Sequence, residues 1–474
     1  MSGLLIFILL LALWHVVLFF GHSLGISVIL FMVPLIAFIY YFLSKNNKIK
    51  NWHGLLLSVP IIILSLHYLL FNNNTFNVLN YIVILFLLLL MYVLTVKPTY
   101  NFKEILFDFA KFVYKPFIYI GEFYKEHLKK FFRGIKISDN GKRLIKTLLI
   151  ILPIVIVVLL LLSNADPNFK NLFKIVIDFI TDILKFEFID KLLGKIFMFI
   201  VMIFVIGTST MYLVKDYGKE SYKVKERKNK DIYTIKVLVT VLNIIYIIFD
   251  IIQIKSLFIH SSSSYINYAS YARSGFFELM VVSLINMTII LISKNYKTDK
   301  KNTKYMNIMS ILMLFLTLII IVSSFIRMHL YEVAYGYTVL RLLVDVVLIT
   351  EVLLMIPTVM YIINSEFNIS KAFLIIIICV YCCVNYINID CFIANKNINR
   401  YNNGSKLDIE YLETYTTDNI PILINLYNST DDNKIKSELL DYFEVIRDTN
   451  KINSWEEFNI SKYRTIKQLE KLGL

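Results

Sequence analysis

The 474-residue chain is 57% hydrophobic and only 18% charged, whereas soluble proteins are about 45–50% apolar and about 25% charged. It contains 36 Phe and 31 Tyr but only 14 Gly and 8 Pro. This composition excludes an ordinary soluble enzyme and predicts an all-helical, multi-pass membrane protein.

The positive charge of the chain is concentrated in short loops. Lys and Arg total 49 against 35 acidic residues, a net charge of +14, which in a soluble protein would suggest nucleic acid. Here 29 basic and 11 acidic residues lie in the segments 44–53, 97–147, 215–236, 294–304 and 364–371. Basic loops stay on the cytoplasmic side. We therefore expect membrane lipids rather than nucleic acid as partners, with these loops and the N-terminus inside the cell.

Apolar stretches long enough to cross a bilayer recur along the chain, since a span needs about 20 apolar residues. Eleven segments qualify: 4–20, 26–43, 54–71, 78–96, 144–162, 195–214, 235–253, 274–293, 306–326, 338–363 and 372–388. An odd number of spans places the region after residue 388 outside. The organisation we predict is a four-span N-terminal region with a basic segment (1–143), a seven-span core (144–387) and an extracytoplasmic helical domain (388–474).

Two stretches between spans have the character of membrane-surface segments. In 171–193, Lys174, Asp178, Asp182 and Lys185 form one polar stripe on an otherwise apolar helix, which is typical of a helix lying in the interface. The stretch 100–133 is rich in Lys and aromatic residues. It is either a surface for anionic lipid or an ordinary loop that sets the topology.

The composition changes abruptly at Asn388, from apolar to Asn, Asp, Lys and Glu. We predict short helices over 408–413, 420–427 and 434–447, and a last helix that begins at Ser454 or Ser461 and ends at Lys471. The third has apolar residues at helical spacing, so one of its faces must be buried.

The cysteines give no strong indication of a metal or of a disulfide framework. Cys379, Cys382 and Cys383 lie in or near the end of an apolar helix, and Cys391 follows it. A Cys-x-x-Cys pair binds zinc only with further ligands, whereas free cysteine packs as a small hydrophobe. We favour packing, and we expect no metal and no cofactor. Because no catalytic motif is present either, we assign no catalytic residues.

Charged residues within spans are costly and are functional candidates by default. Those near the predicted outer ends are Asp250, Arg273, Glu278, Arg341 and Asp345, with Glu351 deeper. One hypothesis is a polar vestibule in which Arg273 and Arg341 bind an anionic group. In it, Glu278, Asp345 and Asp250 act as their partners or as proton acceptors. The alternative is a set of structural ion pairs. Arg341 and Asp345 are four residues apart, which allows a pair on one helix face.

Several short motifs occur in order along the chain. The most specific is Tyr271-Ala-Arg-Ser-Gly-Phe-Phe-Glu-Leu279. The others, in order, are Ser163-Asn-Ala-Asp-Pro167, Tyr337-Thr-Val-Leu-Arg341, Ile393-Ala-Asn-Lys-Asn397 with Arg400, Leu407-Asp-Ile-Glu-Tyr-Leu412 and Thr417-Asp-Asn-Ile-Pro421. Together they resemble a bacterial membrane family, the domain-of-unknown-function 4173 family, together with its relative numbered 4153. The resemblance implies an integral protein of the bacterial cytoplasmic membrane and gives weight to Arg273, Glu278 and Arg341, but it supplies no substrate.

Three functions remain open from the sequence. The first is a transporter or a lipid- or anion-handling protein that uses the charged vestibule. The second is a sensor or accessory protein that recruits a cell-envelope partner through residues 388–474. The third is a membrane-embedded transferase, which is disfavoured because no acidic pair stands in an outer loop. The sequence leaves the oligomeric state open.

Overall fold

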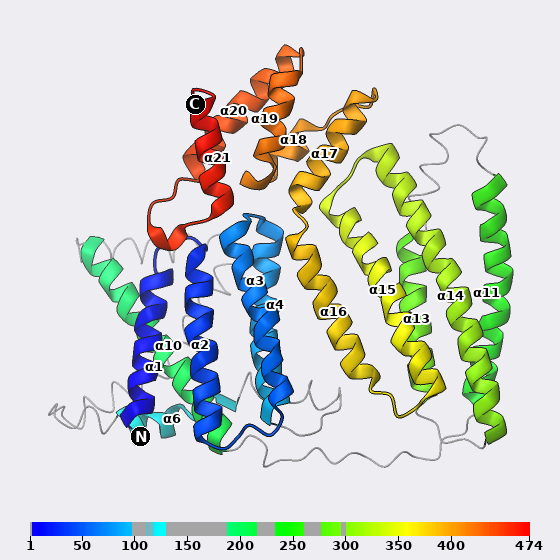
Figure 1. Ribbon diagram of the computed structural model, residues 1–474, viewed down its shortest axis with the longest axis horizontal. Helices are drawn as coiled ribbons and strands as arrows, with labels where there is room; N and C mark the ends of the chain where they lie inside the picture. The colour runs from blue at the N-terminus through cyan, green and yellow to red at the C-terminus, as the bar shows by residue number, and fades with distance from the viewer. Residues whose placement is uncertain are drawn as a thin grey trace, which may run out of the picture. The chain divides into compact units, whose positions relative to one another are not determined.

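The computed structural model describes residues 2–96, 111, 115–116, 118–128, 187–215, 233–259, 276–294 and 300–474 (Figure 1). Within these residues the regular structure is entirely helical, with no strand, as the composition predicted. The chain divides into two compact units, residues 1–23, 33–49 and 106–220 in the first and residues 24–32, 50–105 and 221–474 in the second.

The first unit is built around α1 (Ser2–Phe19) and α10 (Glu187–Lys215), which pack against each other. The short α6 (Ile120–Phe123) also packs on α10. Gly207 makes this possible, because a Cβ there would lie 2.2 Å from the ring of the buried Phe123. The predicted surface helix over 171–193 lies mainly outside the described residues. Its last residues, from Glu187, lie in α10.

The second unit begins with a helical hairpin. After α2 (Ile26–Lys45), which the two units share, a 3₁₀ turn (η1, Trp52–Leu57) leads into α3 (Ser58–Leu70), and α4 (Asn74–Val96) returns beside it. Asn72 and Asn73 form the turn between α3 and α4, and both are buried. Buried amides in a turn need hydrogen-bond partners, and these come from the C-terminal helices.

Five further helices of the second unit form a bundle (Figure 1): α11 (Tyr233–Ile259), α13 (Phe276–Ser293), α14 (Lys300–Tyr335), α15 (Val339–Ile363) and α16 (Ile369–Tyr386). α14 packs against α11, α13 and α15, and α16 packs against α15 and α3. The shared core of α11, α13, α14 and α15 consists of Ile, Leu, Val and Met side chains such as Val239, Ile290 and Met313. The packing of these four helices against one another therefore rests on apolar side chains.

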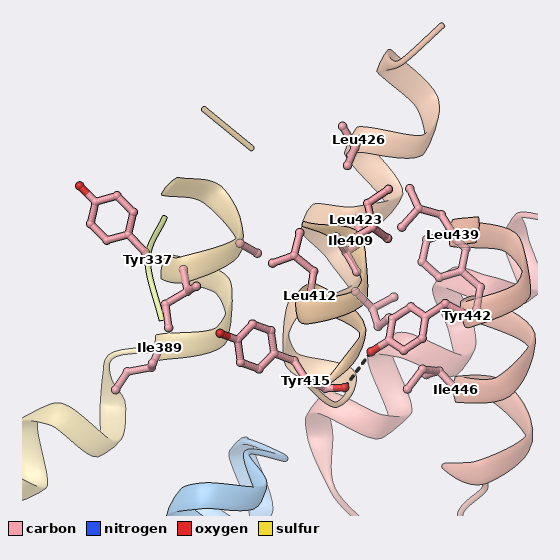
Figure 2. Close-up of a cluster of buried hydrophobic side chains, with 14 of the residues drawn as sticks. Tyr337, Ile389, Ile409, Leu412, Tyr415, Leu423, Leu426, Leu439, Tyr442 and Ile446 are labelled. Atoms are coloured by element: carbon pink, nitrogen blue, oxygen red, sulfur yellow. Dashed lines mark hydrogen bonds between the residues drawn. The ribbon is translucent and has the colours of Figure 1, made fainter. Parts of the chain in front are cut away.

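The C-terminal domain consists of α17 (Ile389–Asn402), α18 (Ile409–Glu413), η5 (Thr417–Asn419), α19 (Ile420–Ser429), α20 (Asn433–Thr449), η6 (Trp455–Glu457) and α21 (Ile460–Lys471). Figure 2 shows the centre of its core, where Leu412, Leu423 and Leu439 converge and the Tyr442 hydroxyl donates to the Tyr415 carbonyl at 2.7 Å. The predicted helices from residue 408 onward are confirmed. The helix α17 was not predicted.

The predicted spans agree closely with the helices. Ten of the eleven coincide with a described helix, and the eleventh, 144–162, lies outside the described residues. Seven helices of the described chain are long and apolar enough to cross a membrane. α1 and α13 contain shorter apolar stretches, and α15 carries three charged residues but belongs to the same bundle. The protein is a multi-pass helical membrane protein.

Candidate functional site

Five charged residues surround the turn between α14 and α15 and form what we call the charged joint. They come from three helices: Glu332 of α14, Arg341 and Asp345 of α15, and Lys396 and Arg400 of α17. Glu332 lies within electrostatic reach of Arg341, Asp345 and Lys396. The joint therefore brings together two of the predicted candidates, Arg341 and Asp345, with three charges that they were not predicted to meet.

The turn has this shape because of Gly336. Its φ angle is +92°, a region that glycine enters without the steric penalty paid by other residues. The Gly336 N–H donates to the Glu332 carbonyl at 2.8 Å and ends α14. A Cβ at this position would lie 2.9 Å from Nη1 of Arg400. Thr338 then begins α15, because its side chain accepts a hydrogen bond from the Arg341 N–H.

Two side chains of α17 hold the turn from the other side. The Asn397 side chain makes two hydrogen bonds with the backbone of Tyr337. It accepts from the Tyr337 N–H at 2.8 Å and donates to the Tyr337 carbonyl at 3.0 Å. Arg400 donates from Nε to the Val333 carbonyl at 2.8 Å and from Nη2 to the Ala334 carbonyl at 2.9 Å. The last carbonyls of a helix lack partners within it. Arg400 thus caps α14 with a cation, as the helix dipole favours.

Arg341 faces the same turn from α15. Its Nη1 donates to the Gly336 carbonyl, and its guanidinium carbon lies 4.2 Å from the ring centroid of Tyr331. Nε and Nη2 of Arg341, and Nη1 of Arg400, have no hydrogen-bond partner among the described residues. Both arginines are half-buried, and Lys396 is exposed beside them. Burial lowers the pKa of Arg400, but an arginine remains cationic in proteins. The joint therefore offers unused cationic donors.

The two acids of the joint have few partners. Glu332 is only 2% exposed. Its Oε1 and the Oδ1 of Asp345 are buried without a hydrogen-bond partner in the described structure. The spacing on α15 allows an Arg341–Asp345 pair, but Arg341 turns instead to the Gly336 carbonyl and the Tyr331 ring.

The remaining predicted candidates lie elsewhere. Asp250 is buried on α11 with both carboxylate oxygens unpartnered, and Glu351 is buried on α15, where the Ser283 hydroxyl donates to its Oε2. Glu278 is exposed at the start of α13. No contact in the described parts joins any of these three to the charged joint. Arg273 lies outside the described residues, so its relation to the joint stays a prediction.

A second polar centre, which we call the acid pair, lies outside the spans and consists of Asp390 of α17 and Asp418 of η5. Both carboxylates are buried, with exposures of 2% and 4%. The Asn72 N–H donates to both oxygens of Asp418 at 3.0 Å, and the Asn73 side chain donates to Asp390 at 2.7 Å. The acid pair therefore supplies the partners that the α3–α4 turn requires.

Burial raises the pKa of both carboxyl groups of the acid pair. It raises the pKa of Asp390 to about 7, with repulsion from Asp418 adding to the effect, and it raises the pKa of Asp418 to about 6 against the hydrogen bonds from Ser461 and Asn72. The Cys391 thiol donates to the Asp418 carbonyl, and burial raises its pKa as well. Among the described residues no group of three or more His, Cys, Asp or Glu side chains could hold a metal ion.

Comparison with known proteins identifies a family. Residues 58–426 match the family described as Domain of unknown function (DUF4153). The chain belongs to this family. No curated protein and no solved structure matches the chain. The matched residues include both the charged joint and the acid pair. The matched family, 4153, is the one that the sequence motifs suggested as a relative of the 4173 family. Membership of the 4173 family itself stays a prediction.

Glu332 and Lys396 are residues of the joint that the sequence reasoning missed. The predicted span ended at residue 326, because Arg327, His329 and Glu332 interrupt the apolar pattern, whereas α14 continues to Tyr335. Gly336 was the available signal, since glycine commonly follows the last turn of a helix. Lys396 lies inside Ile393–Asn397, one of the motifs on which the family resemblance rests, but placing it required the unpredicted helix α17.

Proposed function

We propose that this protein handles an anionic solute or lipid head group, in transport or lipid handling, and binds it at the charged joint on the outer side of the membrane. The observation that carries the proposal is the convergence of Arg341, Lys396 and Arg400 on one turn, with guanidinium N–H groups left over. Such groups bind carboxylate and phosphate oxygens well.

The two acids of the charged joint would compete with an incoming anion for the cationic groups beside them. Glu332 and Asp345 lie beside the cations, and each has a buried oxygen that no described group satisfies. Two nearby carboxylates reduce the positive potential that an incoming anion meets. Protonating them removes this competition, so we expect the anion to bind more tightly as the pH falls.

A second candidate is a sensing or accessory role, favoured by one observation. The core of the C-terminal domain continues into the bundle, because Val339, Leu342 and Leu343 of α15 and Val380 of α16 pack against it. A partner bound to the C-terminal domain could thus act on α15 directly. Deleting residues 400–474 would not test this role, since the deletion would expose that shared core.

The anion proposal is tested with purified full-length protein in nanodiscs of neutral lipid. Binding is measured separately for inorganic phosphate and for short-chain phosphatidylglycerol, with wild type, Arg341→Gln and Lys396→Gln. Lys434→Gln is the matched control, because Lys434 is an exposed lysine on α20 whose ion pair is with Glu438. We expect each joint variant to weaken binding about 10-fold, equivalent to ~1.4 kcal/mol.

Arg341 also holds the Gly336 carbonyl, so its variant can lose stability as well as affinity. Lys396 is exposed, and its replacement leaves the turn intact. The proposal fails if Lys396→Gln binds both probes as tightly as wild type does. Loss of lipid binding alone identifies a head-group site, whereas loss of binding to both probes identifies a site for small anions.

A further inference from the structure

Two separate sets of hydrogen-bonded polar side chains lie in the interior of the bundle. The Ser283 hydroxyl of α13 donates to Oε2 of Glu351 on α15. One turn further along α13, the Asn286 amide donates to the Thr317 hydroxyl of α14 at 3.0 Å and accepts from the Tyr246 hydroxyl of α11 at 2.7 Å. Four helices thus place polar groups beside the apolar core that they share.

Most members of these two sets have their hydrogen-bonding capacity used. Thr317 also donates to the Met313 carbonyl at 2.6 Å, and both Asn286 atoms have partners. Glu351 differs, because its Oε1 is buried without a partner although the residue is only 2% exposed. Within the two sets, the unused hydrogen-bonding capacity therefore belongs to one carboxyl oxygen, Oε1 of Glu351.

In the described part of the chain, no positively charged side chain lies beside Glu351 to stabilise a negative charge. Among the described residues, Ser283 is its one hydrogen-bond partner, and no charged side chain of α13, α14 or α16 acts on it. The nearest acid on its own helix is Asp345, six residues earlier, or about 9 Å along the axis. An unpaired charge in such a place is costly, and the group takes up a proton instead.

We propose that Glu351 is a proton-binding site inside the membrane bundle, with Ser283 as the residue that positions its carboxyl group. The proton adds to Oε1, the oxygen without a partner, and the carboxyl group becomes neutral. On release the proton returns to water and the charged carboxylate keeps the Ser283 hydrogen bond. This inference does not rest on the anion site, since neither residue belongs to the charged joint.

Dicyclohexylcarbodiimide provides a direct test, because this apolar reagent reacts with protonated carboxyl groups in membranes. The purified full-length protein in nanodiscs is labelled between pH 5 and pH 9, and mass spectrometry of its peptides reports the modification of each acid. We expect Glu351 to be labelled in wild type, with labelling that falls as the pH rises, and the added mass to be absent from that peptide in Glu351→Gln.

Ser283→Ala provides the second variant and separates a positioning role from simple burial. The hydroxyl favours the charged carboxylate by donating to it. Its removal should therefore shift the midpoint of labelling upward by about half a pH unit or more. Thr288→Ala is the control on the same helix, because Thr288 is exposed and bonds only its own helix, at the Leu284 carbonyl.

The outcomes decide the proposal in either direction. An absence of label at Glu351 at every pH, or labelling that does not change with pH, overturns it. Protection of Glu351 by sodium chloride but not by choline chloride at constant pH also overturns it, in favour of a metal cation. An unchanged midpoint in Ser283→Ala removes the role of the serine.

Discussion

The buried acids of the C-terminal domain and those of the bundle differ in how they are satisfied. Asp418 accepts two bonds from the Asn72 N–H, and Asp390 accepts one from Asn73. In the bundle, Glu351 has the Ser283 hydroxyl at one oxygen and no partner at the other, and Asp250 has both oxygens unpartnered. Asp390 and Asp418 therefore hold the α3–α4 turn against the C-terminal domain. The unpartnered oxygens of Glu351 and Asp250 hold no other segment in place.

This difference distinguishes buried acids that stabilise the fold from buried acids that are candidates for binding. A buried carboxylate that satisfies backbone donors replaces bonds that the turn would otherwise lose, so its removal costs stability. A buried carboxylate with an unused oxygen contributes little to the fold and is costly to bury. Acids of the second kind in a membrane protein are candidates for ligand or proton binding. We therefore expect replacement of the acids to change the free energy of unfolding differently in the C-terminal domain and in the bundle.

The largest expected effect is a pH dependence that arises from the acid pair. The pKa of Asp390 is about 7 in the folded chain, against about 3.9 in an unfolded chain. Between these values the folded state holds a proton that the unfolded state releases, so stability is greatest at low pH and declines as the pH rises toward 7. From pH 5 to pH 8 this contribution amounts to about 3 kcal/mol.

Reversible unfolding in mixed micelles at pH 5 and pH 8 measures this effect. Asp390→Asn keeps an acceptor for Asn73 and has no proton to lose, so we expect it to flatten the pH dependence. Asp431→Asn is the control, because Asp431 is exposed in the same domain. If Asp390→Asn retains the full dependence of wild type, the acid pair is not its source.

A smaller loss of stability is expected from Asn397→Ala at the charged joint. The change removes both bonds to the Tyr337 backbone and leaves a buried N–H and a carbonyl without partners, at a cost of about 2 kcal/mol. Thermal unfolding of the full-length protein measures it. Asn395→Ala on the same helix is the control, since Asn395 is exposed. Equal effects of the two changes would contradict the role of Asn397 as a clamp.

Much of the fold could be predicted from the sequence, because spans and amphipathic helices leave a periodic apolar signal. The end of α14 and the helix α17 were not predicted, for the same reason. Both are short polar stretches whose helical state depends on tertiary bonds, those of Arg400 to the Val333 and Ala334 carbonyls for example. No local pattern encodes such bonds.

The candidate site could be predicted only in part. Spacing identified Arg341 and Asp345 as neighbours on one face, but the choice of partner for Arg341 depended on Gly336, whose positive φ angle turns a carbonyl toward the guanidinium. Glu351 was recognised as a charge within a span. Its contact with Ser283 joins two residues that are 68 positions apart in the sequence, and no spacing within the sequence reveals such a contact.

Replacing Glu351 should change stability less than the replacements of Asp390 and Asn397 do. Removing one member of a buried ion pair costs about 3–5 kcal/mol, whereas Glu351→Gln removes a carboxyl group that has no ionic partner and keeps an acceptor for Ser283. We therefore expect it to change the free energy of unfolding by less than about 1 kcal/mol. Leu348→Ala, one turn earlier on α15 and fully buried, should cost about 2–5 kcal/mol and shows that the assay responds to this helix. A loss from Glu351→Gln as large as that of Leu348→Ala would place Glu351 with the structural acids.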